Sequence, residues 1–176
     1  GELRPPPQQL PPPSPCPGAN GWQEHLALPD GATELPWEAR ETVYVDGAWT
    51  FLHAAQQGIL QAARARGTHL LVGVHSDNVL KKEFDGPVLE NFETRLGRVL
   101  QSRHVSSVLK GAPWIVTAAM LSSLGIRRVI TGSICKTQDV GALVDSSRDP
   151  YRVPREMGIL EVVQSLDETT ERSVHE

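Results

Sequence analysis

The chain has 176 residues, of which 39% are hydrophobic and 22% charged, which suffices for one domain with its own core. Its net charge of −4 and the lack of a basic run disfavour a nucleic-acid partner, because a phosphate backbone requires clustered Lys and Arg. No apolar run approaches the roughly 20 residues of a transmembrane helix, and the distant pair Cys16 and Cys135 indicates a reducing, intracellular compartment.

Proline dominates residues 1–20, which hold 8 of the 14 prolines. Because proline fixes φ and lacks an N–H, we expect a disordered, polyproline-like spacer there. A ligand for a proline-recognition domain is the less favoured alternative. We therefore assign residues 1–38 to a largely disordered linker and residues 39–176 to the folded domain. Trp22 and Trp37 suggest that part of the linker docks on this domain.

Strands and helices alternate from residue 41 onward. Apolar runs predict strands at 41–45, 69–74, 105–109, 127–131 and 159–163, with helices at 53–66, 91–103, 116–124 and from 169. This alternation predicts an α/β fold, a doubly wound parallel sheet in a single domain. Ligands of such sheets bind beyond the carboxyl ends of the strands. That places one set of residues near a single rim: Asp46, His53, His75, Gly111 and Thr131.

The segment 43–56 reads as a buried strand, a turn at Gly47 and a helix that begins near His53. The first N–H groups of a helix lack partners, and the helix dipole favours negative charge there. A nucleotide phosphate is therefore the first ligand to consider. We expect Gly47 to make the turn and Asp46 to cap the helix.

Four segments carry a resemblance to a known family: 43–60, 71–77, 109–117 and 149–159. The Gly-Ala-Pro-Trp run at 111–114 and the Asp-Pro-Tyr run at 149–151 are not generic nucleotide motifs. These segments resemble the cytidylyltransferases of phospholipid head-group synthesis, and most of all the second, C-terminal domain of the ethanolamine-phosphate type. In that family this domain follows a linker.

The resemblance implies a nucleotidyltransferase fold of Rossmann-like type. It also implies transfer of CMP from CTP to phosphoethanolamine, with CDP-ethanolamine and pyrophosphate as products and Mg²⁺ on the phosphates. A sister cytidylyltransferase domain is the implied partner. The implied location is the cytoplasm, including the periphery of the endoplasmic reticulum.

The family signature at the first helix is His-x-Gly-His, in which both histidines stabilise charge on the phosphates. The aligned residues are His53, Ala54, Ala55 and Gln56. His53 is therefore the candidate catalytic residue, or alternatively a histidine left at a helix start. Ala55 adds a methyl group in the phosphate path, and Gln56 can form hydrogen bonds but cannot carry positive charge.

Further positions are carried over by the same resemblance. Lys82 aligns with the catalytic lysine, although Lys81 is a rival and a solvated loop lysine is the alternative for both. Thr131 and Gly132 replace a His-Gly pair. The threonines at 169–170 match a Thr-Thr pair, with an N-cap as the alternative role. The nucleotide-binding candidates are Asp46, Gly47, Ala48, Gln56, Gly111, Thr131, Gly132, Thr169 and Thr170.

Other residues of the matched segments have weaker assignments. Arg95 matches a family arginine, with a salt-bridged surface residue as the alternative. The spacing of His75 and Asp77 is weak evidence for a metal site, and we assign no metal ligands. Trp114 is expected to pack behind the helix that it precedes.

Three alterations leave two functions open. Gln56, Thr131 and the acidic pair at 167–168 all weaken the handling of phosphate charge. The chain is therefore either a weak enzyme domain acting on CTP or a non-catalytic domain that packs against an active sister domain. We prefer the second role for the isolated chain and the first for its parent.

Overall fold

A computed structural model describes residues 22–32, 34–83, 87–132 and 149–164. The predictions for residues 1–20, for Thr169 and Thr170, and for the acidic pair at 167–168 lie outside the described residues.

Six strands form one sheet in the order β1-β4-β3-β2-β5-β6. Strands β2 to β6 are parallel, and β1 pairs antiparallel with β4. The order reverses between β2 and β5, which is the point where ligands of doubly wound sheets bind. The strand bounds are β1 Leu26–Ala27, β2 Thr42–Gly47, β3 His69–Val74, β4 Ser107–Lys110, β5 Ile126–Gly132 and β6 Leu160–Val163.

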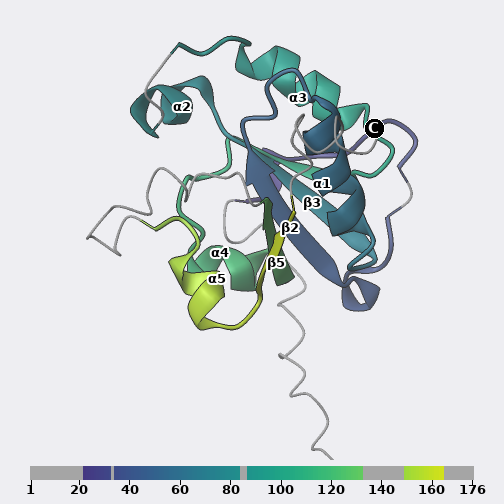
Figure 1. Cartoon of the computed structure of the whole chain (residues 1–176). Helices are drawn as coiled ribbons and strands as arrows, with labels where there is room; N and C mark the ends of the chain where they lie inside the picture. The colour runs from purple at the N-terminus through teal and green to yellow at the C-terminus, as the bar shows by residue number, and fades with distance from the viewer. Residues whose placement is uncertain (1–21, 33, 84–86, 133–148, 165–176) are drawn as a thin grey trace, which may run out of the picture.

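Helices cover both faces of the sheet (Figure 1). Helices α1 and α3 lie over one face, and α4 and the segment around α5 lie over the other. The helix bounds are α1 Ala54–Arg64, α2 Asp77–Glu83, α3 Phe92–Leu100, α4 Ala118–Ser123 and α5 Arg152–Glu156. Two short 3₁₀ turns, Gln23–His25 and Trp37–Ala39, precede the second strand.

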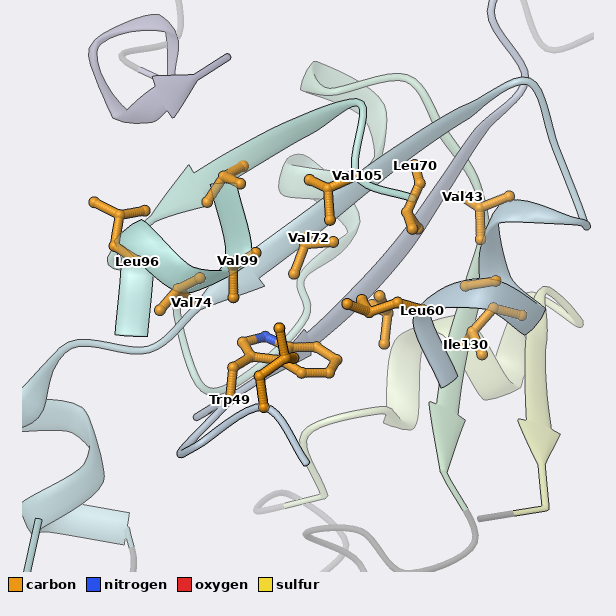
Figure 2. Packing of buried hydrophobic residues seen from close by; sticks show 14 of the residues in the cluster. Val43, Trp49, Leu60, Leu70, Val72, Val74, Leu96, Val99, Val105 and Ile130 are labelled. Atoms are coloured by element: carbon orange, nitrogen blue, oxygen red, sulfur yellow. The ribbon is translucent and has the colours of Figure 1, made fainter. Parts of the chain in front are cut away.

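Alternating side chains of the central strands divide the core into two clusters, as strand geometry requires. In β2, Val43 and Val45 face α1 and α3, whereas Tyr44 faces α4. Figure 2 shows the first cluster, in which the Trp49 indole lies among aliphatic side chains such as Val72 and Ile130. Both faces of β3 are buried, which explains its nearly continuous apolar sequence.

The predicted α/β fold is confirmed, and each predicted strand and helix within the described residues is present; all but the strand at 69–74 have shifted ends. The helix expected at 91–103 begins at Phe92, because the Asn91 side chain accepts a hydrogen bond from the Thr94 N–H. It ends at Leu100. Besides the two 3₁₀ turns, three short elements were not predicted, namely β1, α2 and α5.

The segment before residue 39 is not all spacer. Leu26 and Ala27 pair with Leu109 and Val108 of β4. Trp22 packs against the second core cluster, as its apolar ring led us to expect. The Trp37 ring lies 5.5 Å from the Arg40 guanidinium carbon, in a cation–π contact.

His69 is a buried titratable group at the start of β3, where its Nε2 lies 2.8 Å from the Ser107 hydroxyl. Burial, aided by the charges of Arg40 and Arg64, lowers the pKa of His69 from 6.5 to about 4. The unfolded chain therefore binds a proton before the folded chain does as the pH falls. Stability is lost as the pH falls from about 6.5 toward 4.

We expect the lowered pKa of His69 to reduce the free energy of unfolding by about 2–3 kcal/mol when the pH is lowered from 7 to 4.5. His69→Gln keeps a partner for Ser107 but cannot be protonated, so its stability should fall less over that interval. Urea unfolding at the two pH values measures the difference. His53→Gln, at an exposed site, is the control and should behave like the unaltered chain. Equal losses in all three proteins would contradict the assignment.

Candidate nucleotide site

The carboxyl ends of the parallel strands form one rim of the sheet. Gly47 and Gly132 end β2 and β5 on either side of the point where the strand order reverses. Thr131 and Gly132 are buried, and Gly111 follows β4 with a φ of +65°, a conformation that glycine adopts without strain. The expected common rim of these residues is therefore present.

The β2–α1 loop, residues 48–53, makes the turn that the sequence assigned to Gly47. Gly47 is instead the last residue of β2, in register with Val74 of β3. Three residues of the loop have positive φ although none is glycine: Trp49 at 59°, Phe51 at 60° and Leu52 at 41°. Such conformations cost about 1–3 kcal/mol each and persist only where surrounding contacts hold them.

Contacts on the sheet hold the first half of this loop. The Trp49 side chain is 3% exposed, and its indole N–H donates to the Gly73 carbonyl at 2.8 Å. The Gly47 Cα faces that indole so closely that an added Cβ would lie 3.3 Å from the ring. Leu52 is also buried, so the loop enters the core twice before α1 begins.

His53 is the N-cap residue of α1, with an exposed side chain that makes no capping hydrogen bond. Ala55 and Gln56 lie in the first turn, where backbone N–H groups have no partner within the helix. The Gln56 Oε1 atom is buried and has no hydrogen-bond partner among the described residues. The start of α1 thus combines an exposed His53 side chain that forms no capping hydrogen bond, a buried unpaired oxygen of Gln56, and first-turn N–H groups without partners in the helix.

Asp46 does not cap α1, and that expectation was wrong. Its side chain is fully buried, and Tyr151 Oη donates to Asp46 Oδ1 at 2.7 Å. Tyr44 Oη lies 3.5 Å from Asp46 Oδ2. Burial, and then the negative charge of Asp46, raise the pKa of Tyr44 well above its usual value. Asp46 therefore joins β2 to a segment more than 100 residues later.

His75 extends this buried network to the other strands. Its Nε2 lies 3.8 Å from Asp46 Oδ2, and its Nδ1 lies 2.9 Å from the Ala112 carbonyl, which can only accept. The His75 ring centroid lies 5.4 Å from that of Trp114. All four segments that carried the family resemblance therefore meet at one buried polar network beneath the rim.

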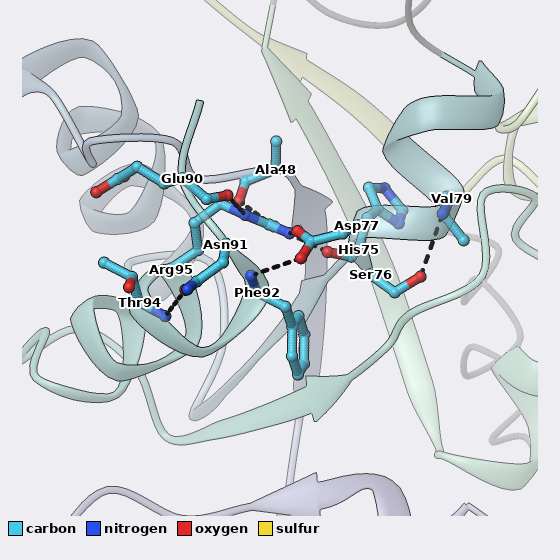
Figure 3. Close-up of polar contacts among 10 residues, drawn as sticks. All are labelled: Ala48, His75, Ser76, Asp77, Val79, Glu90, Asn91, Phe92, Thr94 and Arg95. Carbon is cyan, nitrogen blue, oxygen red and sulfur yellow. Dashed lines mark hydrogen bonds and ion pairs between the residues drawn. The ribbon is translucent and has the colours of Figure 1, made fainter. Parts of the chain in front are cut away.

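Arg95 is fully buried, which corrects the alternative of a surface salt bridge. Figure 3 shows its guanidinium between the β2–α1 loop, the end of β3 and Asp77. Burial would raise the pKa of Asp77, but hydrogen bonds from Arg95 and the Phe92 N–H outweigh it and hold that pKa below its ordinary value. The sequence did not reveal this network, because its acceptors are mostly backbone carbonyls of distant segments.

The lysine candidates lie on α2, not in a loop. Lys81 and Lys82 both have exposed side chains in its last turn. The catalytic role of Lys82 stays a prediction. Within the described ranges, no group of three or more His, Cys, Asp or Glu side chains could hold a metal ion.

A hollow of about 570 Å³ lies away from this rim. It is bounded by residues 28–32 and by the end of α3 with the segment that leads into β4. Because these residues precede β4, the hollow lies toward the amino end of that strand, whereas ligands of this fold bind beyond the carboxyl ends.

Residues 44–153 match the model of the cytidylyltransferase-like family, which is more than half of the chain. The chain belongs to the cytidylyltransferase-like family. The match runs from Tyr44, within β2, to the start of α5, and thus covers every residue of the buried Asp46 network.

Relatives of this cytidylyltransferase-like chain are named ethanolamine-phosphate or choline-phosphate cytidylyltransferases. An ethanolamine-phosphate cytidylyltransferase of Arabidopsis thaliana is 37% identical over 131 residues, which cover 73% of this chain and 30% of that protein. One from Dictyostelium discoideum is 36% identical over 130 residues, or 73% of this chain and 35% of that protein. The human choline-phosphate cytidylyltransferase A is 28% identical over 81% of this chain and 37% of its own length. The chain thus spans about a third of these relatives.

A solved structure supports the fold alone. The lipopolysaccharide core biosynthesis protein from Thermoplasma volcanium superposes with a TM-score of 0.52 at 16% identity, over 73% of this chain and 98% of that one. Among the helices that the structure describes, none has the length and apolar character to span a bilayer.

Proposed function

We propose that this chain is the second, C-terminal domain of an ethanolamine-phosphate cytidylyltransferase, and that CTP phosphates bind at the start of α1. One observation carries the proposal: α1 begins beside the point where the strand order reverses, the His53 side chain makes no capping hydrogen bond there, and the first-turn N–H groups have no partner within the helix. The named relatives supply the substrates, CTP and phosphoethanolamine, by resemblance.

The isolated chain is expected to transfer CMP weakly or not at all. Only the first histidine of the family tetrad is present, and Ala55 and Gln56 occupy the positions of a glycine and a second histidine. Nucleotidyl transfer depends largely on positioning and charge stabilisation, and loss of one donor costs on the order of 10²–10³ in rate.

Mg²⁺ would reach the site on the triphosphate. The described residues offer no three-ligand set for a metal, and the Asp46 carboxylate accepts a hydrogen bond from Tyr151. Mg²⁺ is often held by substrate phosphates with few protein ligands. The proposal therefore assigns this chain no metal-binding side chain of its own.

The second candidate role is a non-catalytic domain that packs against an active sister domain. The degenerate tetrad favours this role for the isolated chain, because the altered positions all handle phosphate charge. By resemblance we place the parent protein in the cytoplasm, including the periphery of the endoplasmic reticulum.

Isothermal titration calorimetry with CTP and Mg²⁺ tests the proposal. We expect measurable binding, and a gain of about 1–3 kcal/mol in Ala55→Gly with Gln56→His, the usual scale for a hydrogen bond to a charged group. The double substitution removes a methyl group from the phosphate path and restores a chargeable donor. Gln61→His adds the same group at an exposed position further along α1 and should leave affinity unchanged.

Absence of binding in both the unaltered chain and the folded double variant would favour the non-catalytic role. Equal affinity of these two proteins would place CTP elsewhere or indicate repulsion by the acidic pair. Asp167→Asn with Glu168→Gln separates the last two explanations, because only repulsion is relieved by neutral side chains.

A further inference from the structure

We infer that Arg95 is a positioning residue for the nucleotide site, because its guanidinium fixes the β2–α1 loop from which α1 begins. This inference rests on the proposed function. Arg95 NH1 donates to the Ala48 carbonyl at 2.8 Å and to the His75 carbonyl at 2.8 Å. Its NH2 donates to Asp77 Oδ1 at 2.7 Å, and its Nε donates to the Glu90 carbonyl at 3.0 Å.

These acceptors come from separate parts of the chain. Ala48 opens the loop, His75 follows β3, Asp77 begins α2, and Glu90 precedes α3. A single buried side chain therefore fixes the distance between the ends of β2 and β3 and the start of α3 (Figure 3). Only the planar guanidinium of arginine can donate to acceptors in these separate directions, since the ammonium group of lysine is a compact charge.

The β2–α1 loop needs contacts from other segments because its own backbone conformation is energetically unfavourable. Trp49, Phe51 and Leu52 have positive φ values, and non-glycine residues keep such conformations only under constraint. Arg95 holds the loop at Ala48, and the Glu90 carboxylate accepts the Phe51 N–H at 2.5 Å. The Glu90 carboxylate is itself paired with Arg98, so both anchors of the loop originate at α3.

The position of the loop sets the position of the site. His53 caps α1 directly after the loop, so a displaced loop moves both the histidine and the first-turn N–H groups. A small displacement of groups that bind phosphate weakens binding, although Arg95 itself need not touch the nucleotide. Arg95 therefore acts through the β2–α1 loop.

Arg95→Lys tests this role, with Val99→Ala as a matched control on the same helix. Val99 is fully buried in the core cluster, so its truncation lowers stability without removing a hydrogen bond to the loop. Amide hydrogen exchange of residues 48–56 reports on the loop, and calorimetry with CTP and Mg²⁺ reports on the site. We expect Arg95→Lys to speed exchange in 48–56 and raise the CTP Kd by at least tenfold. Val99→Ala should do neither at a comparable melting temperature.

Should Arg95→Lys fail to fold, Asp77→Asn supplies the second variant, because it keeps the shape of the partner and removes its charge. Asp77→Asn should also speed amide exchange in 48–56 and should raise the CTP Kd by about threefold. Exchange in 48–56 that matches Val99→Ala overturns the inference, whether or not CTP binds. If neither the unaltered chain nor the folded Ala55→Gly, Gln56→His variant binds CTP, the proposed function falls. The exchange comparison then decides by itself whether Arg95 holds the loop.

Discussion

Gly73→Ala is expected to destabilise the domain by about 3 kcal/mol, at the upper end of the usual cost of overpacking a core. A Cβ at Gly73 would lie 2.3 Å from Tyr44 Oη and 2.8 Å from the Ala112 Cβ. Tyr44 cannot withdraw easily, because it is fully buried in the second core cluster. The Gly73 carbonyl also accepts the Trp49 indole N–H, so a shift of β3 would disturb the β2–α1 loop.

Urea unfolding measures this loss, and Gly97→Ala provides the matched control. Gly97 lies within α3, and an added Cβ there meets no atom within 4 Å. Alanine at that position should stabilise the chain by up to about 1 kcal/mol, because glycine is unfavourable within a helix. A Gly73→Ala variant as stable as the unaltered chain would show that the sheet relaxes around the new methyl group.

The second large effect concerns turnover. We expect the isolated chain to transfer CMP from radiolabelled CTP to phosphoethanolamine at least 100-fold more slowly than about one per second, an ordinary enzyme rate. At positions 56 and 131 this chain has Gln and Thr where the family has histidines that stabilise phosphate charge. Ala55→Gly with Gln56→His should raise the rate by about 10², since it restores one such group.

One control variant and one refuting outcome complete the turnover assay. His53→Ala in the double variant should abolish the gain, because the restored pair requires both histidines. A rate near one per second in the unaltered chain would refute the interpretation of this domain as catalytically degenerate.

The regular elements of the fold could be predicted because their signals are local. The apolar run at 69–74 predicted β3 with its observed bounds, and Asn91 marked the start of α3. The unpredicted elements carry weak local signals. Strand β1 has two residues, α2 buries only Leu80, and α5 contains Pro154, which is tolerated because a first-turn residue needs no N–H partner.

The candidate site was less predictable because its determining contacts are long-range. Asp46 precedes a glycine and a helix, which is typical of a cap, yet its carboxylate turns toward a tyrosine 105 positions later. Arg95 matched a family arginine, with a salt-bridged surface residue as the alternative, yet carbonyls from three segments converge on its buried side chain. Neither burial follows from neighbours in the sequence.

Strand β1 has a consequence for solubility. Without Leu26 and Ala27, the outer side of β4 would present unpaired N–H and C=O groups, and such a margin invites pairing with another chain. The two residues of β1 cover the edge of β4, and β1 is too short to pair with a further strand. A fragment that began at residue 39 would keep the rim at the carboxyl ends of the strands but would lose β1. Such a fragment would self-associate through the exposed edge of β4, while the rim itself stayed intact.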